Sequence, residues 1–158
     1  MVGIFLTVAL AAEPAPELRV ERAGTAVLGS FALANLAAGT TGYFTAQDPA
    51  WQTFHGTNAA WNTVNLGLAA ASAVSLVQRP DESRSTREAR GRRLHRILAI
   101  NAGLDVGYMA AGGALWALGT SDDQPELTGV GSALLLQGAC LLAFDLTWRA
   151  RHRRALAL

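Results

Sequence analysis

The sequence predicts an all-α protein, a four-helix transmembrane bundle whose helices run up-down-up-down. Three observations predict it. Of the 158 residues, 51% are apolar, a high share for a soluble domain of this size. Four segments reach the roughly 20 apolar residues that cross about 30 Å of hydrocarbon. All 13 arginines, the only Lys or Arg residues, lie before the first segment, between the second and third, or after the fourth, which is one side of the four segments.

The first 22 residues form a separate N-terminal segment, apolar at 2–12 and then proline-containing. An apolar run of this length is too short to span a membrane, but Ala9-Leu10-Ala11 resembles the cleavage site of a secretory signal. The run is therefore either signal-like or a short segment that lies on the membrane surface.

The membrane domain is expected over residues 23–148, with spans at 24–44, 58–78, 95–118 and 129–148. The first two spans contain no charged side chain, whereas the third and fourth contain Asp105 and Asp145. A soluble bundle would carry charges along an outer face of each helix. Because the connections are short, consecutive helices should be antiparallel neighbours.

The arginines predict the orientation. They precede the first span, fill the connection between the second and third, and form an arginine-rich tail at 149–158. Such clusters mark the cytoplasmic side, so we expect a bacterial inner-membrane protein with both termini in the cytoplasm and arginines against anionic headgroups. A cleaved signal would invert this orientation. We base the predicted orientation on the distribution of the arginines. Nucleic acid is not an expected partner, since no aromatic stacking pattern accompanies them.

Polar residues recur inside the spans at helical spacing. Asn62 and Asn65 share a face of the second span, and Asn101, Asp105 and Tyr108 share a face of the third. Asn35 and Gln137 lie near the middle of the first and fourth spans. Counting about 1.5 Å per residue places a polar group from every span near one depth. We therefore expect a shared polar core.

Asp105 is the main candidate in this core. No Lys or Arg lies at its depth in the spans, so an ionised Asp105 would be unpaired and costly, and the neutral, hydrogen-bonded acid is expected. Such an acid could carry a proton or hold a cation or a small polar solute. Alternatively, the acid and the amides only fasten the helices together, each bond contributing about 0.6–2 kcal/mol.

Three further expectations concern packing and access. Gly103 and Gly107 have the small-xxx-small spacing of close helix contacts, so the third helix should be the most buried. Asp145 should form an interfacial ion pair, with Arg149 one turn further on or with Arg93 or Arg96 at similar depth. The cavity entrance is expected at three residues of the second helix and the connection before it: His55, Asn58 and Trp61.

The sequence offers no pattern for cofactor or metal binding. Cys140 is the single cysteine, and His55 and His95 lie at opposite ends of the spans, so neither zinc nor haem ligation is indicated. No Ser-His-Asp, P-loop or Rossmann pattern is present. An enzyme using Asp105 or His55 is therefore the least favoured interpretation.

Three motifs carry a family resemblance: HGTNAAWNTVN at 55–65, NAGLDVGY at 101–108, and QG followed by FD at 137–145. Across about 17–148 they resemble an uncharacterised family of small bacterial four-span membrane proteins. The resemblance implies architecture and no activity. Our leading hypothesis is a unit, homodimeric if it transports, that binds or moves a small polar solute or proton. The alternative is a structural or accessory membrane subunit.

Overall fold

The computed structural model describes residues 15–78 and 82–156, which fold into four long α-helices. These are α1 (Pro16–Thr45), α2 (Pro49–Val77), α3 (Arg84–Ser121) and α4 (Pro125–Ala155). No strand occurs among the described residues, so the predicted all-α, four-helix class is confirmed. Within that part of the chain, all four helices are long and apolar enough to cross a membrane. The apolar run at 2–12 lies outside the described residues.

The helix ends follow from local sequence. Proline opens α1, α2 and α4, where its missing N–H has no intrahelical partner to lose. At the start of α2 the side chain of Asp48 accepts a hydrogen bond from the backbone N–H of Trp51 at 3.0 Å. Ser83 caps α3 in the same way, and such caps satisfy otherwise free N–H groups.

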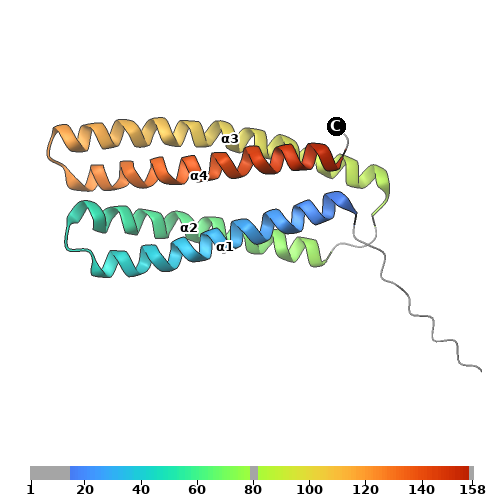
Figure 1. The fold of residues 1–158 in the computed structure, drawn as a ribbon, viewed down its shortest axis with the longest axis horizontal. Helices are drawn as coiled ribbons and strands as arrows, with labels where there is room; N and C mark the ends of the chain where they lie inside the picture. The colour runs from blue at the N-terminus through green and yellow to red at the C-terminus, as the bar shows by residue number, and fades with distance from the viewer. Residues whose placement is uncertain (1–14, 79–81, 157–158) are drawn as a thin grey trace, which may run out of the picture.

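The helices form two hairpins that lie side by side (Figure 1). The α1–α2 and α3–α4 turns lie at one end, and the start of α1 and the end of α4 lie at the other. α4 packs against each of the other three helices, whereas α3 packs chiefly against α4. The expectation that the third helix is the most buried is therefore wrong, and α4 has that position.

The reason lies in the faces that α3 presents. A Cβ added at Gly103 or Gly107 would meet nothing within 4 Å among the described residues, so their face is unpacked. The buried positions of α3 instead recur every seven residues: Gly91, Leu98, Asp105, Gly112 and Gly119. Those of α4 do the same: Gly131, Gly138, Asp145 and His152. A seven-residue repeat keeps one face of each helix toward its neighbour, as in left-handed bundles.

Glycine sets the spacing of this α3–α4 seam. A Cβ at Gly112 would lie 2.8 Å from the carbonyl oxygen of Gly131, and a Cβ at Gly138 would lie 2.9 Å from that of Asp105. Neither contact leaves room for a side chain, so the two backbones approach closely. Asp105 and Asp145 are thus the carboxylic acids of a seam otherwise made largely of small residues.

Charged residues separate along the bundle. The described arginines lie on the first turns of α1, the first half of α3 and the last turns of α4, which meet at one end of the molecule (Figure 1). Asp48, Asp122, Asp123 and Glu126 lie at the hairpin end. The fold therefore gathers the arginines, together with several glutamates, at one end of the bundle and acidic residues without arginines at the other.

Candidate functional site

Away from the arginine-rich end, the buried polar residues and Asn35 form two groups. The first, here called the amide cluster, joins α1, α2 and α4 and consists of Asn35, Asn58, Asn62, Asn65 and Gln137. The second, the carboxyl pair, joins α3 and α4 and consists of Asp105 and Asp145. The polar core expected from the sequence is therefore divided between two sets of helices.

The amide cluster is a connected chain of hydrogen bonds. Asn58 lies at its centre: its Nδ2 donates to Oδ1 of Asn35 at 3.2 Å, and its Oδ1 accepts from Nε2 of Gln137. Nδ2 of Asn62 donates to the carbonyl oxygen of Asn58 at 2.9 Å, and Asn65 donates to Asn62 at 3.5 Å. Asn62 and Gln137 are 0% and 1% exposed. An amide both donates and accepts, so the members of this cluster bond to one another, while Oε1 of Gln137 is buried without a hydrogen-bond partner among the described residues.

The carboxyl pair is buried but not satisfied. Asp105 is 4% and Asp145 is 5% exposed, and their carboxyl groups lie close enough to interact with each other. Two ionised carboxylates at close range repel each other, so a state in which they share one proton is favoured. Oδ2 of Asp105 is buried and has no hydrogen-bond partner among the described residues. A proton or a cation would therefore stabilise the pair.

The expected ion pair between Asp145 and Arg149 is wrong. Asp145 turns into the α3–α4 seam toward Asp105, while Nε of Arg149 donates to Nε2 of His95 at 3.2 Å. Asp145 and Arg149 are one helical turn apart on α4, but they face different residues of α3: Asp145 faces Asp105, and Arg149 bonds to His95. Tertiary packing, rather than spacing along α4, decides the partners.

The carboxyl pair lines a cavity of about 650 Å³ to which all four helices contribute. The cavity exists because α3 packs on α4 and leaves space toward α1 and α2. Asn65, Asn101, Tyr108 and Trp61 also line it, and the last two meet edge to face with ring centroids 4.7 Å apart. The lining is predominantly apolar.

The three residues expected at an entrance occupy different places. Trp61 lines the cavity, whereas Asn58 is 4% exposed and belongs to the amide cluster. His55 packs between the hairpin helices, where a Cβ on Gly42 would collide with its ring, and it contacts the ring of Phe54. The structure therefore brings Trp61 to the carboxyl pair's cavity and leaves Asn58 and His55 out of its lining.

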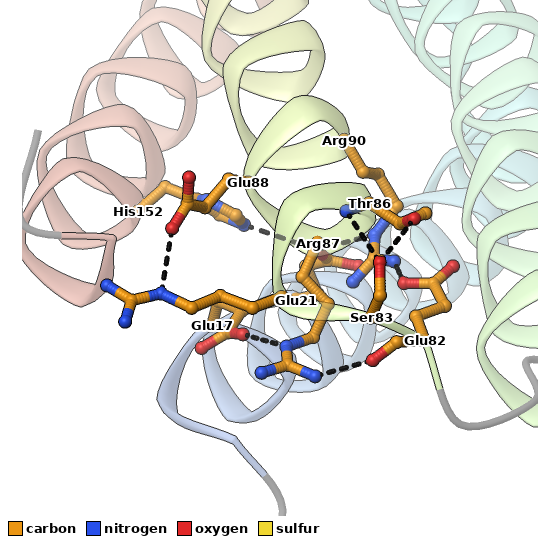
Figure 2. Close-up of polar contacts among 10 residues, drawn as sticks. Glu17, Glu21, Glu82, Ser83, Thr86, Arg87, Glu88, Arg90 and His152 are labelled. Carbon is orange, nitrogen blue, oxygen red and sulfur yellow. Dashed lines mark hydrogen bonds and ion pairs between the residues drawn. The ribbon is translucent and has the colours of Figure 1, made fainter.

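An ionic cluster at the arginine-rich end was not expected from the sequence (Figure 2). Nε of Arg87 lies 2.9 Å from Oε1 of Glu17, and Nε of Arg90 lies 3.3 Å from Oε1 of Glu21. Arg90 also pairs with Glu82. These contacts tie the start of α1 to the start of α3. The sequence does show two glutamates one turn apart at the start of α1. Their arginine partners are about seventy residues away, so spacing along the chain could not identify them.

His152 of α4 completes the ionic cluster. It is fully buried, and its Nε2 lies 3.6 Å from Oε1 of Glu21. Glu21, Arg90 and Arg93 also line the cavity that contains the carboxyl pair. The cavity therefore extends from the carboxyl pair to the ionic cluster at the end of the bundle.

The fold and the site together define a small all-α four-helix protein with four candidate membrane spans and a buried carboxyl pair. The chain belongs to a family of unknown function, DUF6992, whose family model matches residues 27–146. The expected membership of an uncharacterised family is thus confirmed. The match includes the amide cluster and the carboxyl pair but not Glu17, Glu21 or His152 of the ionic cluster. No curated protein and no solved structure matches the chain.

Proposed function

We propose that this protein is a multi-pass membrane protein that binds a proton or a small solute in the cavity at the carboxyl pair. One observation carries the proposal: Oδ2 of Asp105 is buried, has no partner among the described residues, and belongs to a side chain that lines the cavity. A buried polar atom without a partner typically costs about 1–3 kcal/mol. Its retention beside an open space favours a role in binding.

The carboxyl pair supplies the chemistry. Two neighbouring acids favour a shared proton, so loss or gain of a proton changes the charge that faces the cavity. Intramembrane carboxylic acids commonly mark proton or ion pathways. Asp105 lies near the middle of α3, and Asp145 lies one turn before Arg149 on α4. Both acids are buried and line the cavity, where bulk water competes less with a bound solute than at the surface.

The orientation is part of the same proposal. The arginine-rich ends of α1, α3 and α4 favour a cytoplasmic side, with both termini there and the bilayer of a bacterial inner membrane around the helices. Transport would use a homodimer, since four spans leave little room for a private pathway. A C-terminal fusion to a protein that fluoresces only in the cytoplasm should fluoresce. A C-terminal fusion to a phosphatase that is active only in the periplasm should show no phosphatase activity. The reverse pattern would contradict this orientation.

Carbodiimide labelling tests access to the carboxyl pair. N,N′-dicyclohexylcarbodiimide is apolar and adds to protonated carboxyl groups, giving a stable acylurea detectable by peptide mass spectrometry. In native membranes we expect labelling of Asp105 or Asp145, because burial of two neighbouring acids favours a protonated form and both line the cavity. Asp122, an exposed and water-facing acid, serves as the internal control and should remain unmodified.

The double variant Asp105→Asn with Asp145→Asn should lose this labelling while the helices remain folded by circular dichroism. If neither aspartate of the wild-type protein reacts, the pair is sealed in a dry seam and the binding proposal fails. That result would favour the second candidate function, a structural or accessory membrane subunit. The hydrogen bonds of the amide cluster between α1, α2 and α4 support such a fastening role for its own part of the bundle.

A further inference from the structure

We infer that the cavity binds a hydrophobic organic cation, such as an ammonium or phosphonium group on an apolar body, and that this cation displaces one proton from the carboxyl pair. The inference rests on the proposed function and names its ligand class. It follows from three properties of the cavity: the sign of the charge at its inner end, the character of its walls, and its volume.

The first property is charge. α2 contributes no ionisable side chain to the lining, α1 contributes Glu21, and α4 contributes Asp145. From α3 come Asp105 and Tyr108 deep in the cavity, and two arginines, Arg90 and Arg93, near the ionic cluster. Arg90 is paired with Glu21 and Glu82. The inner end therefore has acidic groups and no basic one among the described residues, which attracts a cation.

The second property is the apolar and aromatic wall. Leucine side chains from α1, α2, α3 and α4 line the cavity, together with Trp61, Phe144 and Trp148. The faces of aromatic rings attract desolvated organic cations through the ring quadrupole. A small hydrated metal ion would instead need several oxygen, nitrogen or sulfur ligands, and no group of three or more His, Cys, Asp or Glu side chains able to hold a metal exists among the described residues.

The third property is volume. The cavity of about 650 Å³ falls in the range of roughly 300–1,000 Å³ that small-molecule sites occupy. A lone proton or inorganic cation would not fill it, whereas an apolar body on a charged centre would contact the leucine and aromatic walls. The free Oδ2 of Asp105 would then face the cationic centre.

The proton balance follows from the closeness of two buried acids in one cavity lining. With both groups protonated the pair is neutral. A cation that enters releases one proton to the solvent, leaving one carboxylate against the cation and one proton on the other acid. Binding of one cation should therefore release up to one proton, and excess protons should displace the cation.

Tetraphenylphosphonium is a suitable probe because it is apolar, carries a permanent positive charge and cannot itself release a proton. We would measure its binding to the purified full-length protein in detergent by calorimetry and tryptophan fluorescence, and record proton release in weakly buffered solution. We expect saturable binding, proton release at acidic pH, and weaker binding as the pH falls. Asp105→Asn should weaken binding by at least about tenfold, equal to about 1.4 kcal/mol.

The matched control is Asp122→Asn, which removes the same charge from the exposed end of α3 and should bind like wild type. If Asp105→Asn fails to fold, the proton-release measurement on the wild type still tests the inference. Binding that is equal in wild type and Asp105→Asn, or that releases no proton at any pH, would overturn it. So would absence of phosphonium binding.

Binding of a hydrophobic anion in place of the cation would contradict the inference. If tetraphenylborate or oleate binds instead, and Arg93→Gln abolishes that binding, the cavity holds an anionic amphiphile with its head at the arginine-rich end, and the cation inference is wrong. The proposed function and this inference can be tested separately. Carbodiimide labelling of the carboxyl pair without phosphonium binding would support the proton site and contradict only the binding of an organic cation.

Discussion

The amide cluster and the carboxyl pair each include a buried residue of α4, Gln137 and Asp145, yet they differ in their hydrogen bonds and in their contact with the cavity. Gln137 and its partners on α1 and α2 form a chain of donors and acceptors. Each region has one buried oxygen without a partner among the described residues: Oε1 of Gln137 in the amide cluster and Oδ2 of Asp105 in the carboxyl pair. Of these two residues, Asp105 lines the cavity and Gln137 does not. A buried polar atom without a partner therefore indicates a binding site only where its side chain faces an open space.

Chemistry explains why the two regions behave differently. An amide side chain carries its own donors and acceptors, so several amides can satisfy one another without anything from outside. Carboxylates only accept, and two of them need a proton or a cation between or beside them. The amide cluster is therefore suited to fasten helices, and the carboxyl pair is suited to exchange its charge with a solute.

The largest expected effect concerns the glycine seam that holds the carboxyl pair. A Cβ at Gly131 would lie 2.8 Å from the Cα of Trp116 and closer still to other backbone atoms of α3. Gly131→Ala should thus force α3 and α4 apart and destabilise the protein by about 2–3 kcal/mol, near the upper end of common overpacking costs. Unfolding of the purified protein in mixed micelles measures this free energy.

Gly107→Ala is the matched control, because a Cβ there would meet nothing within 4 Å among the described residues. It should leave stability unchanged or raise it slightly, since alanine favours a helix over glycine. Equal destabilisation by both substitutions would show that α3 packs on both faces in the membrane and would contradict the seam described above.

The next prediction compares the two polar regions directly. Asn58→Leu removes the centre of the amide cluster and leaves Asn35 and Gln137 without their partner, so it should cost about 1–2 kcal/mol. Asp105→Asn keeps size and can still bond to Asp145, so stability should change by less than about 1 kcal/mol while carbodiimide labelling falls. A larger loss of stability at Asp105 than at Asn58 would assign fastening to the carboxyl pair instead.

The smallest expected effect lies in the ionic cluster, beyond both regions. A double-mutant cycle with Glu17→Gln and Arg87→Gln should give a coupling of about 0.5–1 kcal/mol, because this pair is partly buried and joins α1 to α3. The control pair Arg84 and Glu88 is exposed and lies within one helix, so its coupling should be at most about 0.5 kcal/mol. Equal couplings would mean that the cluster adds nothing to the contact between α1 and α3.

Much of the fold could be predicted from local sequence. Apolar length determined the number of helices, and helix periodicity placed Asn62 with Asn65 and Asn101 with Asp105 on common faces. The close helix contact predicted from Gly103 and Gly107 was wrong, because small-residue spacing shows where helices can approach and not where they do. The seven-residue line from Gly131 to His152 was the overlooked signal that α4 is the central helix.

The sequence by itself determined a four-helix protein with arginines gathered at one end and polar groups buried along its helices, because these properties depend on composition and helical period. Only the tertiary structure decided which polar groups meet. It joined Asp105 to Asp145 and Asn58 to Gln137, and it left a cavity where α3 does not pack on α1 or α2. Such choices depend on contacts between residues far apart in the chain, which spacing along one helix does not encode.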